Sequence, residues 1–393
     1  MGTSYLLTLL SLVTSFSFGA GDGRPGGDCR PLPLEAGREH VTMGNEFCFL
    51  KEEEMTKIAI NGFGRIGRCI LRLAAKDENI EVVAINDLME PADALHLFMF
   101  DSVHLRFEDA ALEGDMIRAG RQKVRLLKER DPGKLPWKEM GVDVVVESTG
   151  LFRTRSTAAA HIEAGAKKVI ISAPSKGDDP ADLTVVPGVN MDSYNPEKHH
   201  VLSNASCTTN CLAPVIKVLH DNFKVLNAQM TTIHSYTNDQ RILDFPHGDM
   251  RRARAGAVSM IPTTTGAAKA IGLVIPDLAG KVDGMAIRVP TPNVSLVDVT
   301  ARVANPPAGN GAAAVNDALE AATREGPLKN ILGFERRPLV SVDFMGNTLS
   351  SVVDAQCTNV MGDLVKVLSW YDNEMGYSQR MLDLAAYMAE KGV

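Results

Sequence analysis

The sequence predicts an α/β protein with two domains: an N-terminal domain built on a parallel sheet, and an α+β domain with a mainly antiparallel sheet. Three observations support this prediction. A strand, a glycine-rich turn and a helix follow one another from residue 57, and strands alternate with helices as far as residue 172. The strands after residue 230 have no regularly spaced helices between them. A chain of 393 residues is also too long for a single domain with one hydrophobic core, so two domains and an additional segment are expected.

The composition is that of a soluble globular protein, with 45% hydrophobic and 23% charged residues. A net charge of -7 argues against nucleic acid as the main partner and leaves it only as a secondary activity. The six cysteines are too sparse for a disulfide framework, and none has the C-x-x-C spacing of a zinc site. We therefore expect a reducing compartment and no metal.

Residues 1–54 differ from the rest of the chain. The apolar run over residues 6–20 is too short to span a bilayer, so no stable membrane association is expected. It resembles the core of a signal peptide, but no Lys or Arg precedes it. Residues 21–37 are rich in Gly and Pro and are expected to be disordered. A targeting presequence, an over-extended gene model with a start at Met43 or Met55, and a structural extension all stay open.

A dinucleotide-binding unit is predicted at the start of the globular chain. Residues 57–60 form a short apolar run typical of a buried strand, and residues 66–76 have the apolar periodicity of a helix. A second apolar strand over residues 81–85 is followed by Asp87. A strand, a G-x-G-x-x-G turn, a helix, a strand and an acid in this order are the signature of a Rossmann domain.

Each residue of this motif has a physical role in holding a dinucleotide. Gly62 permits the tight turn, Gly64 lets the backbone approach a pyrophosphate, and Gly67 lets the helix pack closely on the strand. Asp87 would accept hydrogen bonds from a ribose diol and would repel a ribose 2′-phosphate. The sequence therefore predicts NAD rather than NADP as the cofactor.

Further strands and a helix extend this parallel sheet. Strands are predicted over residues 142–147 and 168–172, with a helix over residues 157–165 between them. Thr149 and Ser172 lie at the carboxyl ends of these strands, the edge where dinucleotides bind. Both are candidates for cofactor contact, although their hydroxyl groups could equally serve to form turns.

A cysteine among small and hydroxylated residues is the candidate nucleophile. Cys207 lies in Ala-Ser-Cys-Thr-Thr-Asn-Cys, after an extended stretch at residues 200–202 and before a predicted helix over residues 212–219. A helix N-terminus favours the thiolate over the thiol, and its free N–H groups can hold an oxyanion or a phosphate. The alternative is a buried structural cysteine at the start of a helix.

A histidine that takes the proton of the thiol would activate this cysteine. His234 is the best candidate, because it lies among hydroxyl residues in the first strand after the cysteine helix. His199 and His200 are nearer in sequence, but they lie in a loop beside Pro196. Structural histidines outnumber catalytic ones, so the pattern alone leaves the choice open.

From residue 57 to residue 393 the chain closely resembles the phosphorylating glyceraldehyde-3-phosphate dehydrogenases, of the bacterial-like type. The matching motifs are ASCTTNC, HSYT, PTTTGAAK, RVPTP and WYDNE, at residues 205–211, 234–237, 262–269, 288–292 and 370–374. The resemblance implies that Cys207 and His234 form the catalytic pair. It also implies an NAD-binding domain over residues 55–206, a catalytic domain over residues 207–372 and a C-terminal helix over residues 373–393 packing back on the first domain, after the extension of residues 1–54.

The resemblance implies covalent catalysis through a thioester. The Cys207 thiolate would attack the aldehyde of glyceraldehyde 3-phosphate, with its own backbone N–H as an oxyanion donor. His234 would lower the pKa of the thiol and take the hydroxyl proton as hydride passes to NAD. Inorganic phosphate would then attack the thioester and release 1,3-bisphosphoglycerate.

Binding residues also follow from the resemblance. For the substrate phosphate they are Thr237, Arg252 and Arg288. For inorganic phosphate they are Ser206, Thr208, Thr265 and Gly266. For the cofactor they include, besides the glycines, Arg65, Ile66, Asp87, Arg130, Ser172 and Asn373. Members of the family are homotetramers in which the loop over residues 238–257 packs near a neighbour's cofactor.

One departure and two alternatives remain. NAD-specific members usually have Leu-Pro in the loop after the catalytic histidine, where this chain has Phe245-Pro246. The alternatives are an erythrose-4-phosphate dehydrogenase, which hydrolyses its thioester, and a non-catalytic binding protein on the same fold. We expect a cytoplasmic location, or a plastid-like organelle if residues 1–54 are a real presequence.

Overall fold

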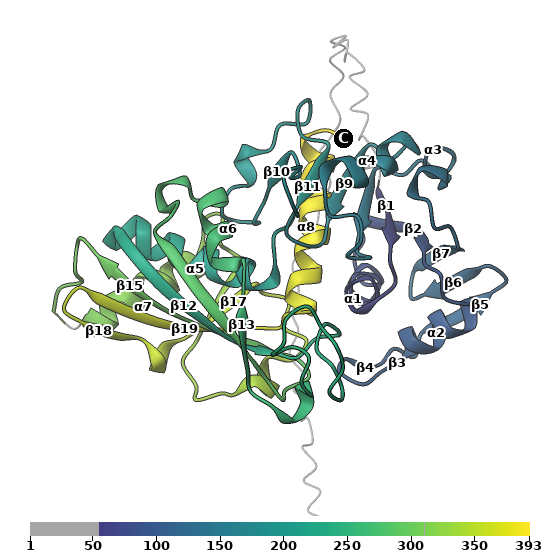
Figure 1. Cartoon of the computed structure of the whole chain (residues 1–393). Helices are drawn as coiled ribbons and strands as arrows, with labels where there is room; N and C mark the ends of the chain where they lie inside the picture. The colour runs from purple at the N-terminus through teal and green to yellow at the C-terminus, as the bar shows by residue number, and fades with distance from the viewer. Residues whose placement is uncertain (1–54, 310) are drawn as a thin grey trace, which may run out of the picture. The chain divides into compact units, whose positions relative to one another are not determined.

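A computed structural model describes residues 55–309 and 311–393 of the chain. The expectations for residues 1–54, including the apolar run and the disordered segment, lie outside the described residues. Among the residues that are described, no helix is both long and apolar enough to cross a membrane. The elements of the described chain are labelled in Figure 1.

The first sheet has nine strands in the order β10-β11-β9-β8-β1-β2-β7-β6-β5. The strands from β10 to β7 are parallel, and β6 and β5 add an antiparallel edge. In chain order they are β1 (Thr56–Asn61), β2 (Ile80–Asn86), β5 (Ala110–Glu113), β6 (Met116–Ala119), β7 (Gln122–Leu127), β8 (Val144–Glu147), β9 (Lys168–Ile171), β10 (Leu183–Thr184) and β11 (Val201–Ser203). The predicted parallel sheet is confirmed, and the antiparallel edge was not foreseen.

Four helices and a small hairpin accompany this sheet. They are α1 (Arg65–Ala74), α2 (Pro91–Met99), α3 (Trp137–Met140), α4 (Arg155–Glu163) and the hairpin of β3 (Phe100–Asp101) with β4 (Leu105–Arg106). Helix α4 begins two residues before its predicted start, because the Thr154 hydroxyl accepts a hydrogen bond from Thr157 N and caps the helix. Short 3-10 turns are η1 (Pro132–Lys134) and η2 (Met191–Ser193).

The second sheet is mainly antiparallel, as predicted. Its order is β13-β14-β12-β15-β19-β17-β16, with β18 paired to β19. Two pairings, β12 with β14 and β16 with β17, are parallel, and the other five are antiparallel. The strands are β12 (Val225–Ser235), β13 (Ile261–Thr264), β14 (Val282–Val289), β15 (Ser295–Val303), β16 (Leu332–Glu335), β17 (Ser351–Asp354), β18 (Asn359–Met361) and β19 (Leu364–Tyr371).

Four of the described helices lie in the second half of the chain, and the one that begins at Cys207 starts five residues before the helix predicted over residues 212–219. They are α5 (Cys207–Phe223), α6 (Ala267–Val274), α7 (Gly311–Arg324) and α8 (Met375–Lys391), with 3-10 turns η3 (Gly256–Val258), η4 (Pro276–Leu278), η5 (Ser341–Phe344) and η6 (Ala355–Cys357). Helix α6 was not predicted.

Cys207 lies where two hydrophobic cores meet. One core joins α5 to the second sheet, the other joins the first sheet to α1 and α8, and Cys207 packs against both. Figure 1 shows α8, in yellow, between the two sheets. Its Met381 and Leu384 are buried in the same core as Ile58 of β1 and Ile70 of α1. The C-terminal helix therefore closes the core of the first sheet next to the start of α5.

Candidate active site

The turn before α5 places the thiol at the first residue of the helix. Strand β11 ends at Ser203, and Ala205 has a φ of 52°, a left-handed conformation that is strained for a residue with a side chain. Tyr377 donates a 2.9 Å hydrogen bond to Ala205 O and holds this turn. The Ser206 hydroxyl caps the helix by accepting from Thr209 N at 3.0 Å. Cys207 therefore lies at a helix N-terminus, as the sequence predicted.

His234 of β12 lies beside this thiol. Its Nε2 is 3.5 Å from Cys207 Sγ, and its Nδ1 is 2.7 Å from Ser235 O. Arg288 Nη1 lies 2.9 Å from both Nδ1 and Ser235 O. A carbonyl oxygen can only accept, so we assign the imidazole proton to Nδ1, which donates to Ser235 O in the shortest of these contacts. With this tautomer Arg288 Nη1 donates to Ser235 O and not to Nδ1. The Nε2 lone pair then faces the sulfur, as a general base requires.

The electrostatics keep both members of this pair uncharged. Burial, with a further contribution from Arg288, lowers the pKa of His234 to about 3. Burial also raises the pKa of the Cys207 thiol, and this outweighs the nearby Arg288 charge, which acts in the opposite direction. The sequence led us to expect a thiol pKa lowered by the helix and the histidine. Burial instead raises the pKa of the thiol and lowers that of the imidazole, since desolvation penalises either charge.

Tyr371 is a part of the site that sequence reasoning missed. Its buried hydroxyl is 2.9 Å from the hydroxyls of Thr208 and Thr232. Its ring stands nearly perpendicular to the His234 ring, with centroids 5.9 Å apart. Burial keeps the pKa of this phenol well above its usual value, so it stays protonated. Tyr371 therefore fixes both the first turn of α5 and the face of the imidazole; the WYDNE motif contained this signal.

The predicted phosphate ligands form two groups. Arg288 belongs to the first through its contact with His234. Arg252 Nε donates to Thr263 Oγ1 at 3.0 Å, and its Nη2 donates to Thr264 O at 3.2 Å. This places Arg252 beside the segment that continues into Thr265 and Gly266.

Several of these groups already have partners within the chain. Arg252 is ion-paired with Asp239, and the Thr237 hydroxyl donates to Gln240 Oε1 at 3.1 Å. Thr265 Oγ1 accepts from Ala267 N at 3.2 Å at the start of α6. Asp239 and Gln240 were not singled out from the sequence. An incoming phosphate would have to share or replace these hydrogen bonds.

The glycine motif has the geometry that its spacing predicts. Gly62 has a φ of 100°, and a Cβ there would lie 2.6 Å from Thr149 N. A Cβ at Gly67 would lie 2.2 Å from Gly62 O, so the helix packs as closely as the motif requires. Gly64 faces open space at the start of α1, which has neither a side-chain cap nor an acidic residue in its first turn. This helix end therefore leaves its N–H groups free for an anion.

Comparison with known proteins identifies the family. The model of the glyceraldehyde 3-phosphate dehydrogenase NAD binding domain matches residues 56–155, and that of the C-terminal domain of the same family matches residues 206–373. The glyceraldehyde-3-phosphate dehydrogenase of Geobacillus stearothermophilus is 57% identical over 339 residues, which cover 86% of this chain and 99% of that protein. This chain belongs to the glyceraldehyde-3-phosphate dehydrogenase family.

Other relatives agree with this assignment. Glyceraldehyde-3-phosphate dehydrogenase 1 of Bacillus subtilis is 55% identical over 339 residues, covering 86% of this chain and 99% of that protein. A plasmid-encoded glyceraldehyde-3-phosphate dehydrogenase of Cupriavidus necator is 53% identical over 337 residues, covering 85% and 98%. The resemblance inferred from the sequence motifs, and with it the NAD-binding fold of this dehydrogenase family, is confirmed.

Four of the predicted cofactor residues follow the carboxyl ends of strands in the first sheet. Asp87, just after β2, accepts from Phe63 N at 2.7 Å and from Met89 N at 3.0 Å. The Thr149 hydroxyl and N–H both donate to Glu147 Oε1. Ser172 follows β9, and Arg130 lies between β7 and η1.

Two other predicted cofactor residues have side chains that are already engaged. The Arg65 guanidinium is ion-paired with Asp101 and Glu374, so its backbone N–H, beside that of Ile66 in the first turn of α1, is what remains for a cofactor. Asn373 Oδ1 accepts from Ser235 Oγ at 2.8 Å, which leaves its amide N–H groups as donors.

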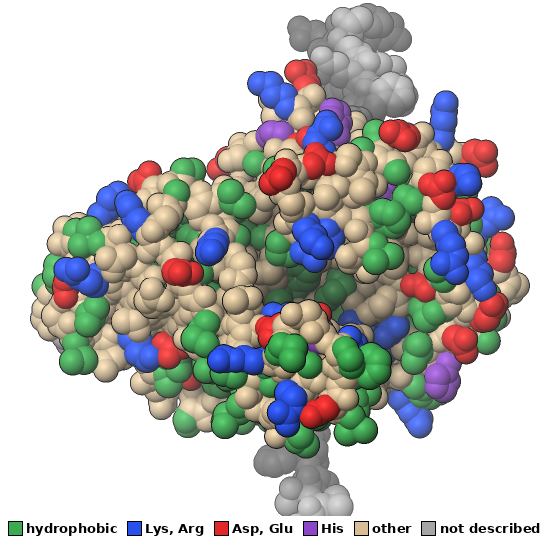
Figure 2. Space-filling model, viewed as in Figure 1, with side chains coloured by type: hydrophobic (Ala, Val, Ile, Leu, Met, Phe, Trp, Pro, Cys, Tyr) green, Lys and Arg blue, Asp and Glu red, His purple; other side chains and the backbone are tan. Residues whose placement is uncertain are grey.

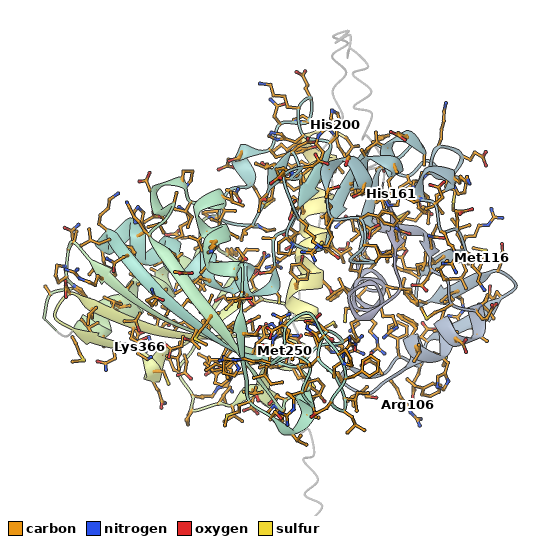
Figure 3. All side chains as sticks on the ribbon, viewed as in Figure 1. Arg106, Met116, His161, His200, Met250 and Lys366 are labelled. Carbon is orange, nitrogen blue, oxygen red and sulfur yellow. The ribbon has the colours of Figure 1, made fainter. Side chains whose placement is uncertain are left out.

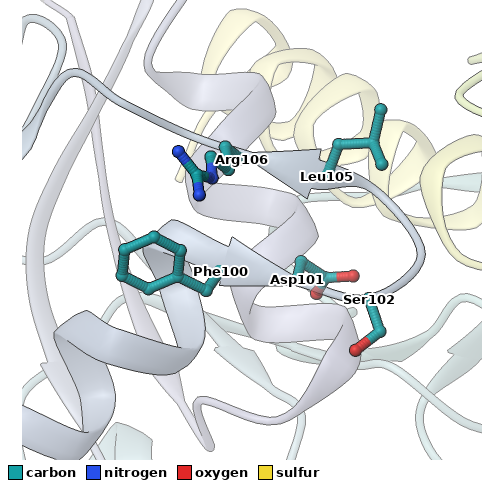
Figure 4. A pocket seen from close by; sticks show the side chains of 5 residues that line it. All are labelled: Phe100, Asp101, Ser102, Leu105 and Arg106. Atoms are coloured by element: carbon teal, nitrogen blue, oxygen red, sulfur yellow. The ribbon is translucent and has the colours of Figure 1, made fainter.

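Two features near α1 contain none of the residues predicted to bind substrate or cofactor. Cys69, His104 and Glu374 place potential metal ligands within 4.8 Å of one another, but the Glu374 carboxylate already accepts from Arg65 and His104. A hollow of about 610 Å³ lies beside the β3–β4 hairpin (Figure 4). It is lined by Phe100, Asp101, Ser102, Leu105 and Arg106. None of the residues predicted to bind substrate or cofactor lines it.

Proposed function

We propose that this chain oxidises glyceraldehyde 3-phosphate with NAD and inorganic phosphate and forms 1,3-bisphosphoglycerate through a thioester on Cys207. The observation that carries the proposal is the position of His234 Nε2, 3.5 Å from Cys207 Sγ. This is the arrangement of a nucleophile beside its general base. The activity is that named for the relatives in Geobacillus and Bacillus.

The first step joins the sulfur to the aldehyde carbon. The Cys207 proton passes to His234 Nε2 while Sγ forms the C–S bond, and the carbonyl oxygen then takes this proton to give a hemithioacetal. The N-terminal N–H groups of α5, including that of Cys207 itself, stabilise the transient oxyanion. Because the pKa of His234 is about 3, its Nε2 is unprotonated at any pH above about 4.

The second step converts the hemithioacetal to a thioester. NAD, when bound, supplies the hydride acceptor for this oxidation. His234 Nε2 takes the hydroxyl proton as the C–H bond breaks and the C=O bond re-forms. Inorganic phosphate then attacks the thioester carbon, the C–S bond breaks, and His234 returns a proton to Sγ.

The chain fits an NAD dinucleotide at the carboxyl edge of the first sheet. The open position at Gly64 and the uncapped start of α1 suit a pyrophosphate. Asp87 would accept hydrogen bonds from a ribose diol and would repel a 2′-phosphate. We therefore assign the NAD-binding role to the three glycines, Arg65, Ile66, Asp87, Arg130, Thr149, Ser172 and Asn373.

We assign the two phosphate positions to the groups beside Cys207. Arg288, Arg252 and Thr237 would bind the substrate phosphate, since guanidinium groups match its oxygens in charge and geometry. Ser206, Thr208, Thr265 and Gly266 would bind the inorganic phosphate through hydroxyl and N–H groups. Because Arg252 contacts Thr263 and Thr264, just before Thr265, the two phosphate positions would be neighbours.

We further propose a homotetramer in the cytoplasm, without a metal. The loop after His234 exposes several large apolar side chains, and hydrophobic side chains are visible around Met250 in Figures 2 and 3. They are Ile242, Leu243, Phe245, Met250, Val258 and Met260. A group of this kind marks a protein–protein interface. Phe245, the departure from the family pattern, is 65% exposed and would be covered there. A plastid-like location stays the alternative if residues 1–54 are a presequence.

The decisive assay follows NADH formation from glyceraldehyde 3-phosphate and NAD, with and without inorganic phosphate. The full chain and Cys207→Ser are compared under the same conditions. Activity that depends on phosphate and disappears in Cys207→Ser supports the proposal. Turnover independent of phosphate, with erythrose 4-phosphate preferred, would assign the hydrolytic activity instead. Turnover with NADP alone would contradict the cofactor assignment.

A further inference from the structure

We propose that Glu147, held in place by His161, is a positioning residue for the dinucleotide. It sets Thr149 and the turn at Gly62 at the edge of the sheet where the cofactor binds. This inference rests on the proposed function, because it assumes that NAD lies at that edge. Neither Glu147 nor His161 takes part in the chemistry at Cys207.

Glu147 lies at the point where the order of the first sheet reverses. From β1 the sheet continues to β2 on one side and to β8 on the other, and dinucleotides bind at such a reversal. Asn61 and Glu147 are direct partners in the β1–β8 register, and Asn61 Nδ2 donates to Glu147 Oε2 at 2.5 Å. Asn86 of β2 donates to Asn61 Oδ1 at 2.7 Å. A buried polar row thus connects the ends of three adjacent strands.

The Glu147 carboxylate is only 1% exposed and is surrounded by hydrogen-bond donors. Oε1 accepts from Thr149 N and Thr149 Oγ1, and Oε2 accepts from Asn61 Nδ2 and His161 Nε2. Among the described residues no Lys or Arg forms an ion pair with it. Four donors match the four acceptor positions of an ionised carboxylate, so the buried charge is held by hydrogen bonds alone.

His161 of α4, labelled in Figure 3, is fully buried and has a fixed tautomer. Trp137 Nε1 lies 3.0 Å from its Nδ1, and an indole N–H can only donate. Nδ1 must therefore be the acceptor, and the ring proton lies on Nε2, 3.1 Å from Glu147 Oε2. The histidine acts as a neutral donor whose direction is set by Trp137.

The Glu147 carboxylate also holds residues at the edge of the first sheet where the cofactor would bind. It holds both the N–H and the hydroxyl of Thr149, and Thr149 N is the atom that a Cβ on Gly62 would strike. Ser148 Oγ also donates to Gly62 O at 2.7 Å. At the other end of the row, Asn86 precedes Asp87. A displaced Glu147 carboxylate would therefore shift Thr149, the Gly62 turn and the spacing to Asp87 together.

Three variants test the proposal. Glu147→Gln places an amide N–H against existing donors in either orientation of its side chain. His161→Leu removes one donor and leaves the indole N–H of Trp137 without its acceptor. His161→Gln keeps one donor and one acceptor and serves as the conservative rescue. NAD affinity is measured by calorimetry, and KM for NAD and kcat are measured with each variant.

We expect Glu147→Gln and His161→Leu to raise Kd and KM for NAD by about tenfold, the cost of a buried donor without a partner. The kcat at saturating NAD should change by less than about twofold, because cofactor positioning is recovered when the site is filled. His161→Gln should stay near wild type. His220→Leu, which removes a buried histidine from α5, controls for loss of stability and should leave KM for NAD unchanged.

The outcomes are distinct. A wild-type chain that fails to bind NAD contradicts the proposed function itself. A wild-type chain that binds NAD, with folded Glu147→Gln and His161→Leu proteins of unchanged affinity, overturns this inference. A fall in kcat without a change in KM overturns it as well. If Glu147→Gln does not fold, Glu147→Asp withdraws the charge by one methylene, and an unchanged KM for NAD there overturns the inference.

Discussion

Two buried histidines of this protein differ in the hydrogen-bond partners of their ring nitrogens. His161, in the NAD-binding part, is 0% exposed, and His234, in the active site, is 3% exposed. His161 accepts from Trp137 and donates to Glu147, so both ring nitrogens have fixed partners. His234 donates from Nδ1 to Ser235 O, and its Nε2 faces the thiol of Cys207.

The difference shows that the partners, rather than burial, decide what a histidine does. Both nitrogens of His161 are engaged in hydrogen bonds, with Trp137 and with Glu147. His234 has one lone pair directed at a reacting atom, and Arg288 beside it favours the unprotonated ring. One histidine is therefore structural and the other is available as a base.

The largest expected effect distinguishes the two rings directly. His234→Asn should lower kcat by about 10²- to 10⁴-fold, the usual contribution of a general base. His161→Gln should leave kcat near the wild-type value, because that ring touches neither substrate nor sulfur. Steady-state rates at saturating NAD, substrate and phosphate provide the measurement. Equal losses in the two variants would show that the comparison is wrong.

The second effect concerns the pH dependence of the reactivity of the Cys207 thiol. Because the pKa of the Cys207 thiol is raised by burial, the thiolate fraction grows as pH rises, and alkylation of Cys207 by iodoacetamide should accelerate through neutral pH into the alkaline range. No change in the ionisation of His234 should appear above about pH 4, since its pKa is about 3.

Arg288→Met should move this alkylation profile to higher pH and slow alkylation several-fold at neutral pH. The reason is that the guanidinium charge is the leading contribution that lowers the pKa of the thiol. Arg254→Met is the matched control, because Arg254 is exposed and pairs with Asp244. If wild type and Arg288→Met have the same pH profile, the claim that Arg288 lowers the pKa of the Cys207 thiol is wrong.

The smallest expected effect tests the fixed tautomer of His161. Trp137→Phe removes the indole donor and should lower the free energy of unfolding by about 1–2 kcal/mol, the cost of a buried hydrogen bond. Denaturant unfolding monitored by circular dichroism measures this value. With its Nδ1 free, the ring can still donate to Glu147, so kcat should not change. A large loss of kcat would mean that the polar row reaches the reacting atoms.

Much of the fold follows from short-range patterns. The strand, glycine turn and helix around Gly62, and the positions of Thr149 and Ser172 after their strands, could be predicted because local periodicity and turn chemistry determine them. The antiparallel edge of β5 and β6 was missed, since short edge strands have mixed polar and apolar residues. The start of α4 depends on the Thr154 cap, which the apolar pattern does not report.

Some residues of the candidate site could be predicted from the sequence and others could not. Cys207 and His234 were found because each lies in a recognisable motif. Tyr371, Glu147, Asp239 and Gln240 were not, because each acts through contacts between distant parts of the chain. The direction of the Cys207 pKa shift also differs from the expectation: a helix start suggested a lowered pKa, whereas burial, which depends on the packing of two cores, raises it.

The most direct test of the central claim is a rapid-mixing measurement of NADH without inorganic phosphate. If Cys207 forms a thioester that only phosphate releases, the full chain with NAD and glyceraldehyde 3-phosphate should give a burst of about one NADH per active site and then nearly stop. Adding phosphate should restore turnover, and Cys207→Ser should show no burst. Sustained NADH formation without phosphate would contradict the account.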